Sequence, residues 1–579
     1  MKKLLGYLKD YKKECILAPL FKMLEASFEL LVPLVIASII DKGIGNADKS
    51  HIIKMVVVLV ALAVIGLLCS LTAQFFSAKA AVGFASRLRH SLFEHLLGLS
   101  FSETDTLGTS TMITRMTSDI NQAQTGVNMF LRLFLRSPFV VFGAMIMAFT
   151  IDFNSALIFA AAIVVLLIIV FRIMLSSIKR QKIVQENLDG VLQTTRENLS
   201  GVRVIRAFCK ENEEIEKFNK RNSLLLSAQK KVAQISALMN PLTYIIINIS
   251  AVTLIWTGAL RVNIGELSQG QVVALYNYMA QILVELIKLA DLIITINKSL
   301  ASAKRISDVF EIKSSMEEKD ELAENSSNDG YSVAFKNVSF IYKNAGGESL
   351  SDISFFVKKG ETVGIIGGTG SGKTTLINMI PRFYDITSGE IIVDGINVKD
   401  YPTAALREKV GIVMQKAELF KGTIRDNLKW RKKDVTDEEL FEAIKIAQAG
   451  DVLKSKNGLD SDVEQNGRNF SGGQKQRLTI ARALVGKPQI LILDDSSSAL
   501  DYSTDANLRK AIKDLSYNPT VFIVSQRASS VKNADIIIVL DDGKIAGKGT
   551  HSELIESCEI YKEIYYSQFS ENPDKEARI

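Results

Sequence analysis

The sequence predicts an α-helical membrane domain, with six transmembrane helices and long cytoplasmic extensions, fused to an α/β nucleotide-binding domain with a phosphate loop. Three observations predict this class. Apolar runs of bilayer-spanning length recur before residue 300. After residue 330, short β-type runs alternate with helical segments. One of those short runs leads into a glycine-rich loop of the phosphate-binding pattern.

The charge balance differs between the two halves of the 579-residue chain. Residues 1–300 carry 31 lysines and arginines against 21 aspartates and glutamates, a net charge of +10, whereas the remainder carries 38 against 42, a net charge of −4. Four cysteines without CxxC spacing and four scattered histidines argue against a zinc site and a disulfide framework. The length itself favours several domains.

Six apolar runs are long enough to cross a bilayer. The run that begins at Ser155 is apolar all round, which a soluble helix does not need. The first and last runs are less clean because they contain charged residues. The six predicted spans are 15–40, 55–76, 131–151, 155–175, 237–259 and 272–297.

The connections between the spans predict how the chain is oriented. Segment 1–14 carries five lysines and the long connection 172–236 carries thirteen lysines and arginines, whereas the three short loops share three. By the positive-inside rule, the N-terminus and both long connections, 77–130 and 172–236, lie in the cytoplasm. The sequence therefore predicts a multi-pass protein of the cytoplasmic (inner) membrane, surrounded by lipids. The positive charge follows from this topology and needs no nucleic acid partner.

Three charged residues in the last span allow two interpretations. Glu285, Lys288 and Asp291 either line a polar translocation cavity or pair with one another along the helix. The sequence alone leaves both open.

The composition turns polar and acidic after the last span, which marks a domain boundary. We predict a transmembrane domain over residues 1–305, a linker over 306–330, a nucleotide-binding domain over 331–570 and a tail over 571–579.

The phosphate loop follows an apolar strand in the second half. Gly367, Gly372, Lys373 and Thr374 match the pattern G-x4-GK-[ST]. In that pattern, loop amides cradle phosphates, the lysine reaches the β- and γ-phosphates and the threonine holds Mg²⁺. Asp494 ends a second buried strand and suits a Mg²⁺-holding role.

The segment FSGGQKQRLTIARAL at residues 470–484 resembles the signature of the ATP-binding cassette (ABC) family. Other motifs occur along the sequence in the order typical of that family. Tyr342 matches the adenine-stacking aromatic, Gln415 matches the Q-loop glutamine and SALD at 498–501 matches the D-loop. The resemblance covers essentially the whole chain and implies an exporter-type half-transporter that binds ATP and Mg²⁺ as a dimer. It implies Mg²⁺ ligation by Thr374, Gln415 and Asp494. The nucleotide-binding residues that it implies are Tyr342, Gly367, Gly370, Ser371, Gly372, Lys373, Thr374, Thr375, Ser471, Gly472, Gly473 and Gln474.

Two positions depart from the family pattern. Asp495 stands where the family has its general-base glutamate, and Gln526 stands where it has its switch histidine. Because both catalytic positions serve the same ATP site, while the signature is intact, the chain is similar to the degenerate-site subunit of heterodimeric bacterial multidrug exporters. This similarity implies a second half-transporter, with the glutamate and the histidine, as partner.

We expect ATP-driven export of hydrophobic or amphipathic small molecules by this heterodimer, with slow hydrolysis at the chain's own site. The alternatives are a lipid or peptide exporter, a homodimer with slow ATPase, and a regulatory protein whose cassette gates a channel. The resemblance also implies coupling helices near residues 105–115 and 206–216.

Overall fold

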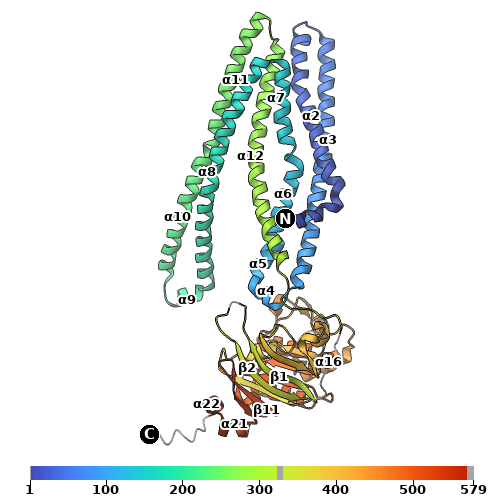
Figure 1. Cartoon of the computed structure of the whole chain (residues 1–579), viewed down its shortest axis with the longest axis vertical. Helices are drawn as coiled ribbons and strands as arrows, with labels where there is room; N and C mark the ends of the chain where they lie inside the picture. The colour runs from blue at the N-terminus through green and yellow to red at the C-terminus, as the bar shows by residue number, and fades with distance from the viewer. Residues whose placement is uncertain (1, 322–329, 344, 455–456, 570–579) are drawn as a thin grey trace. The chain divides into compact units, whose positions relative to one another are not determined.

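The computed structural model describes residues 2–321, 330–343, 345–454 and 457–569. The chain forms two compact units, a membrane unit of Met1–Leu97 with Ser110–Ile312 and a cassette unit of Gly98–Thr109 with Lys313–Ile579 (Figure 1). The short segment Gly98–Thr109 therefore packs with the second half of the sequence, although it lies in the first.

The membrane unit is built of long helices joined by tight turns. Helices α3, α8 and α12 run for 49, 48 and 43 residues, far longer than the roughly 20 that a bilayer requires. The α-helices are α1 (Lys2–Leu5), α2 (Lys12–Ser38), α3 (Lys49–Leu97), α5 (Thr109–Thr114), α6 (Ile120–Leu133), α7 (Arg136–Ile151), α8 (Phe153–Ser200), α9 (Val202–Ala207), α10 (Glu211–Ala237), α11 (Met239–Ile264) and α12 (Gln269–Glu311).

Five helical stretches of the described residues are long and apolar enough to cross a membrane. They are Gly6–Ile44, Lys49–Leu97, Thr109–Ile151, Phe153–Ser200 and Glu211–Ile264. Helix α12, which holds the sixth predicted span, has the length but also Glu285, Lys288 and Asp291 within its apolar sequence. Charged side chains within the apolar stretch of a membrane helix need polar or oppositely charged partners on neighbouring helices.

The helices α2, α7, α8, α11 and α12 share a hydrophobic core. Small residues bring the helices close together: Ala144, Ala148 and Ala274 are fully buried among larger neighbours such as Phe159 and Tyr278. Tyr278 Oη donates a hydrogen bond to the Leu30 carbonyl at 2.6 Å, which satisfies the hydroxyl inside the core. By contrast, α3 exposes a continuous row of aliphatic side chains, as expected for a lipid-facing helix.

The cassette unit contains two main sheets. The six-stranded sheet has the order β12-β11-β3-β10-β9-β6 and is parallel except for β12, and the four-stranded sheet β2-β1-β4-β5 is antiparallel. The strands are β1 (Tyr331–Phe340), β2 (Leu350–Lys358), β3 (Thr362–Gly367), β4 (Ser388–Val393), β5 (Ile396–Asn397), β6 (Val410–Val413), β7 (Gly422–Thr423), β8 (Asp462–Val463), β9 (Ile490–Asp494), β10 (Thr520–Val524), β11 (Ile536–Asp541) and β12 (Lys544–Gly549).

Helices and the antiparallel sheet cover the faces of the parallel sheet, so its central strands are almost entirely buried. All five residues of β9 are buried, and their apolar side chains divide between two hydrophobic cores on opposite faces of the strand. The helices of this unit are α4 (Phe101–Leu107), α13 (Lys373–Asn378), α14 (Thr403–Lys409), α15 (Ile424–Leu428), α16 (Asp437–Ile446), α17 (Gly450–Lys454), α18 (Gly472–Leu484), α19 (Tyr502–Lys513), α20 (Ala528–Val531), α21 (His551–Ser557) and α22 (Glu559–Gln568).

The predicted linker 306–330 begins within the last membrane helix and ends just before the first strand. Helix α12 continues to Glu311, and β1 begins at Tyr331. Residues 322–329 of that linker and the predicted tail 571–579 are outside the described residues.

Candidate functional site

The phosphate loop connects β3 to α13, and its glycines are required by space as well as by backbone conformation. Gly372 has a φ of 95°, and a Cβ there would lie 2.8 Å from the Ser349 carbonyl oxygen. A Cβ on Gly367 would lie 2.1 Å from the Leu540 carbonyl oxygen. Only glycine fits both positions. Gly370, with a φ of 82°, faces open space beside the loop.

Lys373 opens α13 and turns its ammonium group back over the loop. Its Nζ donates hydrogen bonds to the Gly367 carbonyl at 3.0 Å and to Ser371 Oγ at 3.3 Å. Burial lowers the pKa of Lys373, while the charges of Asp495 and Asp494 oppose that shift. A phosphate group in the loop would offer this buried ammonium a stronger partner than the loop carbonyls do.

Thr374 and Asp494 come together as the sequence predicts for a Mg²⁺ site. Thr374 Oγ1 lies 3.0 and 3.2 Å from the two carboxylate oxygens of Asp494. Burial raises the pKa of Asp494, the charge of Asp495 adds to the rise, and the Thr374 hydrogen bond and Lys373 oppose it. A hydroxyl beside a buried carboxylate is a hard-oxygen pair of the kind that Mg²⁺ prefers, so these residues fit the metal.

Asp495 follows β9 in a left-handed conformation, with a φ of 45°. Its backbone N–H donates to the Val524 carbonyl on β10 at 3.0 Å. Burial raises the pKa of the Asp495 carboxyl, whereas the charges of Arg527 and Lys373 and a hydrogen bond from Gln415 lower it. The structure thus brings the predicted residues Gln415 and Asp495 together.

Arg527 is a site residue that the sequence analysis missed. Its guanidinium carbon lies 5.4 Å from the centre of the Tyr502 ring, and its charge acts on Asp495. The preceding residue, Gln526, is exposed, and its backbone carbonyl accepts a hydrogen bond from Gln568 Nε2 at 2.8 Å. Its position directly after the switch position Gln526 is the sequence feature by which Arg527 could have been identified.

Tyr342 lies beside the phosphate loop but is packed among other aromatic rings. Its hydroxyl donates to Thr375 Oγ1 at 3.2 Å, and its ring meets Phe340 and Tyr384 edge to face at 4.7 and 5.2 Å. Burial raises the pKa of Tyr342. The structure therefore places this predicted adenine-stacking residue within reach of the start of α13.

The signature residues form the N-terminus of α18. Ser471 is the N-cap: its Oγ accepts from the Gln474 N–H at 3.3 Å, and its own N–H donates to Gln474 Oε1 at 2.9 Å. A Cβ on Gly473 would lie 3.0 Å from the Ala499 carbonyl, which brings the signature against the D-loop. Gly472 is exposed and faces open space. No contact links these residues to the phosphate loop within the described part of the chain.

Helix α4 docks on the cassette unit through aromatic and acidic residues. The Phe101 ring stacks on Phe383 at 4.5 Å, and Tyr384 Oη donates to Asp105 Oδ2 at 2.6 Å. This helix overlaps the first predicted coupling segment, 105–115. The second predicted coupling segment, 206–216, covers the end of α9 and the start of α10, and Phe208 between these helices is exposed.

Glu103 is the buried acid of α4 and is only 2% exposed. Its Oε2 accepts from the Ser315 N–H at 3.4 Å and Ser315 Oγ at 3.3 Å, and it also accepts from Ser100 Oγ. Burial would raise the pKa of Glu103, but the hydrogen bonds from these two serines outweigh it and leave the pKa lowered. Glu103 therefore ties α4 to the segment that follows α12.

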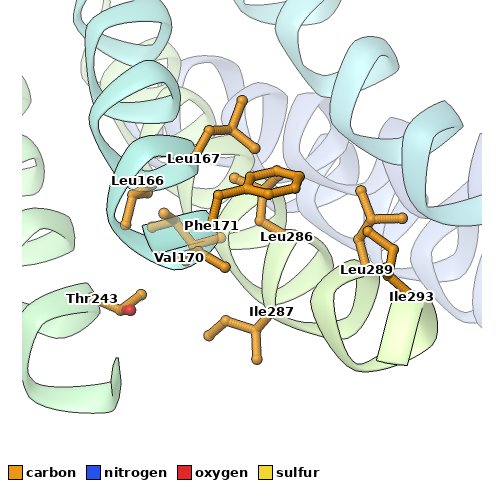
Figure 2. A pocket seen from close by; sticks show the side chains of 10 residues that line it. Leu166, Leu167, Val170, Phe171, Thr243, Leu286, Ile287, Leu289 and Ile293 are labelled. Carbon is orange, nitrogen blue, oxygen red and sulfur yellow. The ribbon is translucent and has the colours of Figure 1, made fainter. Parts of the chain in front are cut away.

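Two kinds of cavity lie in the membrane unit. Figure 2 shows an apolar one between α8, α11 and α12, where Thr243 is the single polar residue among leucine, valine, isoleucine and phenylalanine side chains. Its volume of about 30 Å³ holds no more than a small group. A second cavity, of about 310 Å³, lies between α2 and α12, and its lining combines aliphatic side chains with charged ones, Glu29 and Lys288 among them.

The charged residues of the last span are only partly paired with each other. Lys288 Nζ donates to Glu285 Oε1 at 2.8 Å, as the pairing interpretation predicts. Asp291 is exposed, and no ion pair links it to Glu285 or Lys288 among the described residues. The main partner of Glu285 comes from another helix: Arg136 Nη1 donates to its Oε1 at 2.5 Å.

A bundle of membrane-length helices on one chain with a phosphate-loop cassette defines an ATP-dependent membrane transport protein. The ABC transporter transmembrane region matches residues 15–286, and the ABC transporter cassette matches residues 350–498. The chain belongs to the ABC transporter family, as an exporter half-transporter with its ATPase domain fused to its membrane domain. The predicted fold class, the transport-coupled ATPase and the multi-pass membrane location are confirmed.

Relatives and solved structures match over nearly the full length. The uncharacterized ABC transporter ATP-binding protein YfiB of Bacillus subtilis (strain 168) is 36% identical over 572 residues, 98% of this chain and 99% of its own. An ATP-dependent lipid A-core flippase of Desulfotalea psychrophila is 34% identical over 482 residues, 83% of this chain and 84% of its own. A bacterial Atm1-family ABC exporter solved with ATP bound shares the fold, with a TM-score of 0.80 at 22% identity over 97% of this chain and 99% of that one.

Proposed function

We propose that this exporter subunit works as one half of a heterodimer and holds its degenerate ATP site. In this arrangement the chain's phosphate loop binds ATP with slow turnover. Its intact signature completes a competent site on a partner that supplies the glutamate and the histidine. The observation that carries the proposal is the coincidence of Asp495 and Gln526 in one ATP site.

Both changes remove chemistry that hydrolysis needs. Aspartate is one methylene shorter than glutamate, so its carboxylate would end roughly 1.5 Å short of a water positioned for glutamate. A misplacement of about 1 Å can cost on the order of 10²-fold in rate. Gln526 can donate a hydrogen bond to a phosphate but carries no positive charge and relays no proton. The charge of Arg527 and the hydrogen bond from Gln415 further occupy the Asp495 carboxylate.

The nucleotide-holding residues support ATP binding at this site. Lys373 would hold the β- and γ-phosphates, and Thr374 and Asp494, with Gln415, would hold Mg²⁺, which supplies charge neutralisation to the phosphates. Ser471 and Gln474 are positioned by their mutual hydrogen bonds at the start of an exposed helix end. That geometry supports presentation of the signature to a nucleotide held by the partner.

The test compares the ATPase activity of two variants in the assembled heterodimer. We expect Lys373→Ala in this chain to leave most of the ATPase activity, because it disables only the slow site. Ser471→Ala in this chain should remove most of it, because the signature serves the competent site. Phosphate release measured with the matched variants of the partner provides the control. The opposite order of the two losses would contradict the proposal.

The substrate class that we propose is hydrophobic or amphipathic compounds, with lipids as the second candidate. The lipid candidate is supported by the similarity to lipid A-core flippases, at 34% identity over 83% of this chain. Transport of a fluorescent dye and of a labelled phospholipid into vesicles, measured side by side, separates the two.

A further inference from the structure

Four charged side chains of the membrane unit form a linear chain of charges, in which positive and negative groups alternate. Arg136 on α7 donates through Nη2 to Glu29 Oε2 on α2 at 2.6 Å and through Nη1 to Glu285 Oε1 on α12 at 2.5 Å. Lys288 Nζ donates to the same Glu285 oxygen at 2.8 Å. Along this chain of charges the order is therefore Glu29, Arg136, Glu285 and Lys288. The two negative and two positive charges alternate and sum to zero.

The inner and outer members of this chain of charges differ in their exposure to solvent. The side chains of Arg136 and Glu285 are only 8% and 4% exposed, and Ser137 Oγ gives Glu285 a further hydrogen bond at 2.9 Å. The outer members, Glu29 and Lys288, are 42% and 45% exposed. Each outer member has a single charged partner among the described residues, so each retains capacity for another.

Both outer members line the same cavity of about 310 Å³ between α2 and α12. Its remaining wall includes the amides of Asn277 and Gln281. Gln281 Oε1 is buried without a hydrogen-bond partner in the described structure, and so is the Nε of Arg136, a side chain that the rest of the protein encloses. The cavity wall thus has an unused acceptor, Gln281 Oε1, and one half-exposed charge of each sign, on Glu29 and Lys288.

We propose that this cavity binds the head group of an amphiphile that carries both a primary ammonium and an anionic group. The ammonium pairs with Glu29 and the anion with Lys288, so the ligand closes the linear chain of charges into a ring. The apolar part of the ligand lies along the aliphatic wall formed by Val32, Pro33, Ile36, Ala280 and Val284. A net-neutral head group leaves the cluster balanced, whereas a head group of one sign adds an uncompensated charge inside the membrane.

This inference rests on the proposed export function but is tested without it. The purified full-length chain, with any co-purifying partner retained, is held in uncharged maltoside micelles without nucleotide. Native mass spectrometry then measures the affinity for three ligands of equal tail length: myristoyl lysophosphatidylethanolamine, which carries both charges, myristoyl lysophosphatidylglycerol, which is anionic, and tetradecylammonium, which is cationic. We expect the first to bind at least about tenfold more tightly than the other two.

Two variants make the test specific. Glu29→Gln should weaken lysophosphatidylethanolamine about tenfold and make the anionic ligand the preferred one, and Lys288→Gln should make the cationic ligand preferred. These opposite shifts cannot arise from misfolding. Asp291→Asn and Lys298→Gln make the same chemical changes on exposed positions of α12 and should leave the order of affinities unchanged.

Equal affinity of the wild-type chain for the three ligands, or a loss of preference in the two control variants as large as that in the cavity variants, would overturn the inference. Lys373→Ala, which disables the phosphate loop, should bind lysophosphatidylethanolamine as the wild type does. A failure of the head-group site is therefore distinguishable from a failure of the proposed transport cycle.

Discussion

Asp495 combines an unusual side chain for its motif with an unusual backbone. Its φ of 45° lies in the left-handed region, which aspartate enters more readily than longer side chains do. The sequence identifies the missing methylene but not this conformation, nor the neighbouring charge of Arg527. The aspartate is thus one methylene shorter than the glutamate of the family pattern and well suited to its left-handed turn.

The double variant Asp495→Glu with Gln526→His should turn the slow site into a faster one. It restores the reach of the carboxylate and a side chain that can bear a proton. We expect ATP hydrolysis by this site to rise between about tenfold and a hundredfold. The measurement is phosphate release with the partner's own site disabled. Adding Lys373→Ala to the double variant should abolish the gain, and an unchanged rate in the double variant would show that these two positions do not limit hydrolysis.

Gly372→Ala should destroy nucleotide binding at this site. The left-handed conformation costs a non-glycine residue about 1–2 kcal/mol, and the added Cβ would lie 2.8 Å from the Ser349 carbonyl. The loop must shift, so its amides no longer face the phosphates. A fluorescent ATP analogue should bind at least about tenfold more weakly. Gly472→Ala, at an open position of the signature, is the control and should retain binding.

At the scale of elements, α4 is a seven-residue helix whose stability depends on its surroundings. Isolated helices of this length do not form in water. The stack of Phe101 on Phe383, the hydrogen bond from Tyr384 to Asp105 and the buried Glu103 hold it to the cassette unit. Movement of this surface of the cassette therefore reaches α4 directly.

The attachment of α4 should depend on pH through Glu103. Hydrogen bonds lower its pKa in the folded state, so its stabilising contribution is complete above its usual pKa of about 4.3 and is lost as pH falls through the lowered value. Hydrogen exchange of residues 101–107, corrected for the intrinsic rate, should accelerate in acid. In Glu103→Gln the exchange should be fast already at neutral pH and insensitive to this titration. Glu390→Gln, at an exposed carboxylate of β4, should behave as the wild type.

Elements encoded by residues adjacent in the sequence could be predicted. Elements held in place by residues far away in the sequence could not. Strand β3, the phosphate loop and α13 follow from an apolar run, glycines and a Lys-Thr pair that are adjacent in the chain. The docking of α4 depends on Phe383 and Tyr384, about 280 residues away, and no local pattern encodes such a contact. For the same reason, the sequence suggested the pairing of Glu285 with Lys288 as one of two interpretations, but it did not indicate that Arg136, on another helix, bonds Glu285.

On the scale of the whole molecule, one chain has one phosphate loop and one signature, and no contact between them is found in the described residues. This is consistent with our proposal that a complete site of the family pattern forms with a second chain. We expect the isolated chain to dimerise weakly and to hydrolyse ATP slowly even with Mg²⁺. Light scattering and phosphate release, with and without a candidate partner, measure both. Fast, cooperative hydrolysis by the isolated chain would contradict the heterodimer.

The alternating chain of charges also affects how the membrane unit is made. Ribosomes deliver α2 and α7 before α12, and a lone charge at the centre of a membrane helix costs about 2.5–3.5 kcal/mol on insertion. Until α12 arrives, Arg136 has Glu29 as its carboxylate partner and lacks Glu285. Helices α2 and α7 are therefore most stable in lipid as an early pair. The last helix completes the charge balance as it buries its apolar face, so insertion of the bundle ends with an electrostatic closing step as well as a hydrophobic one.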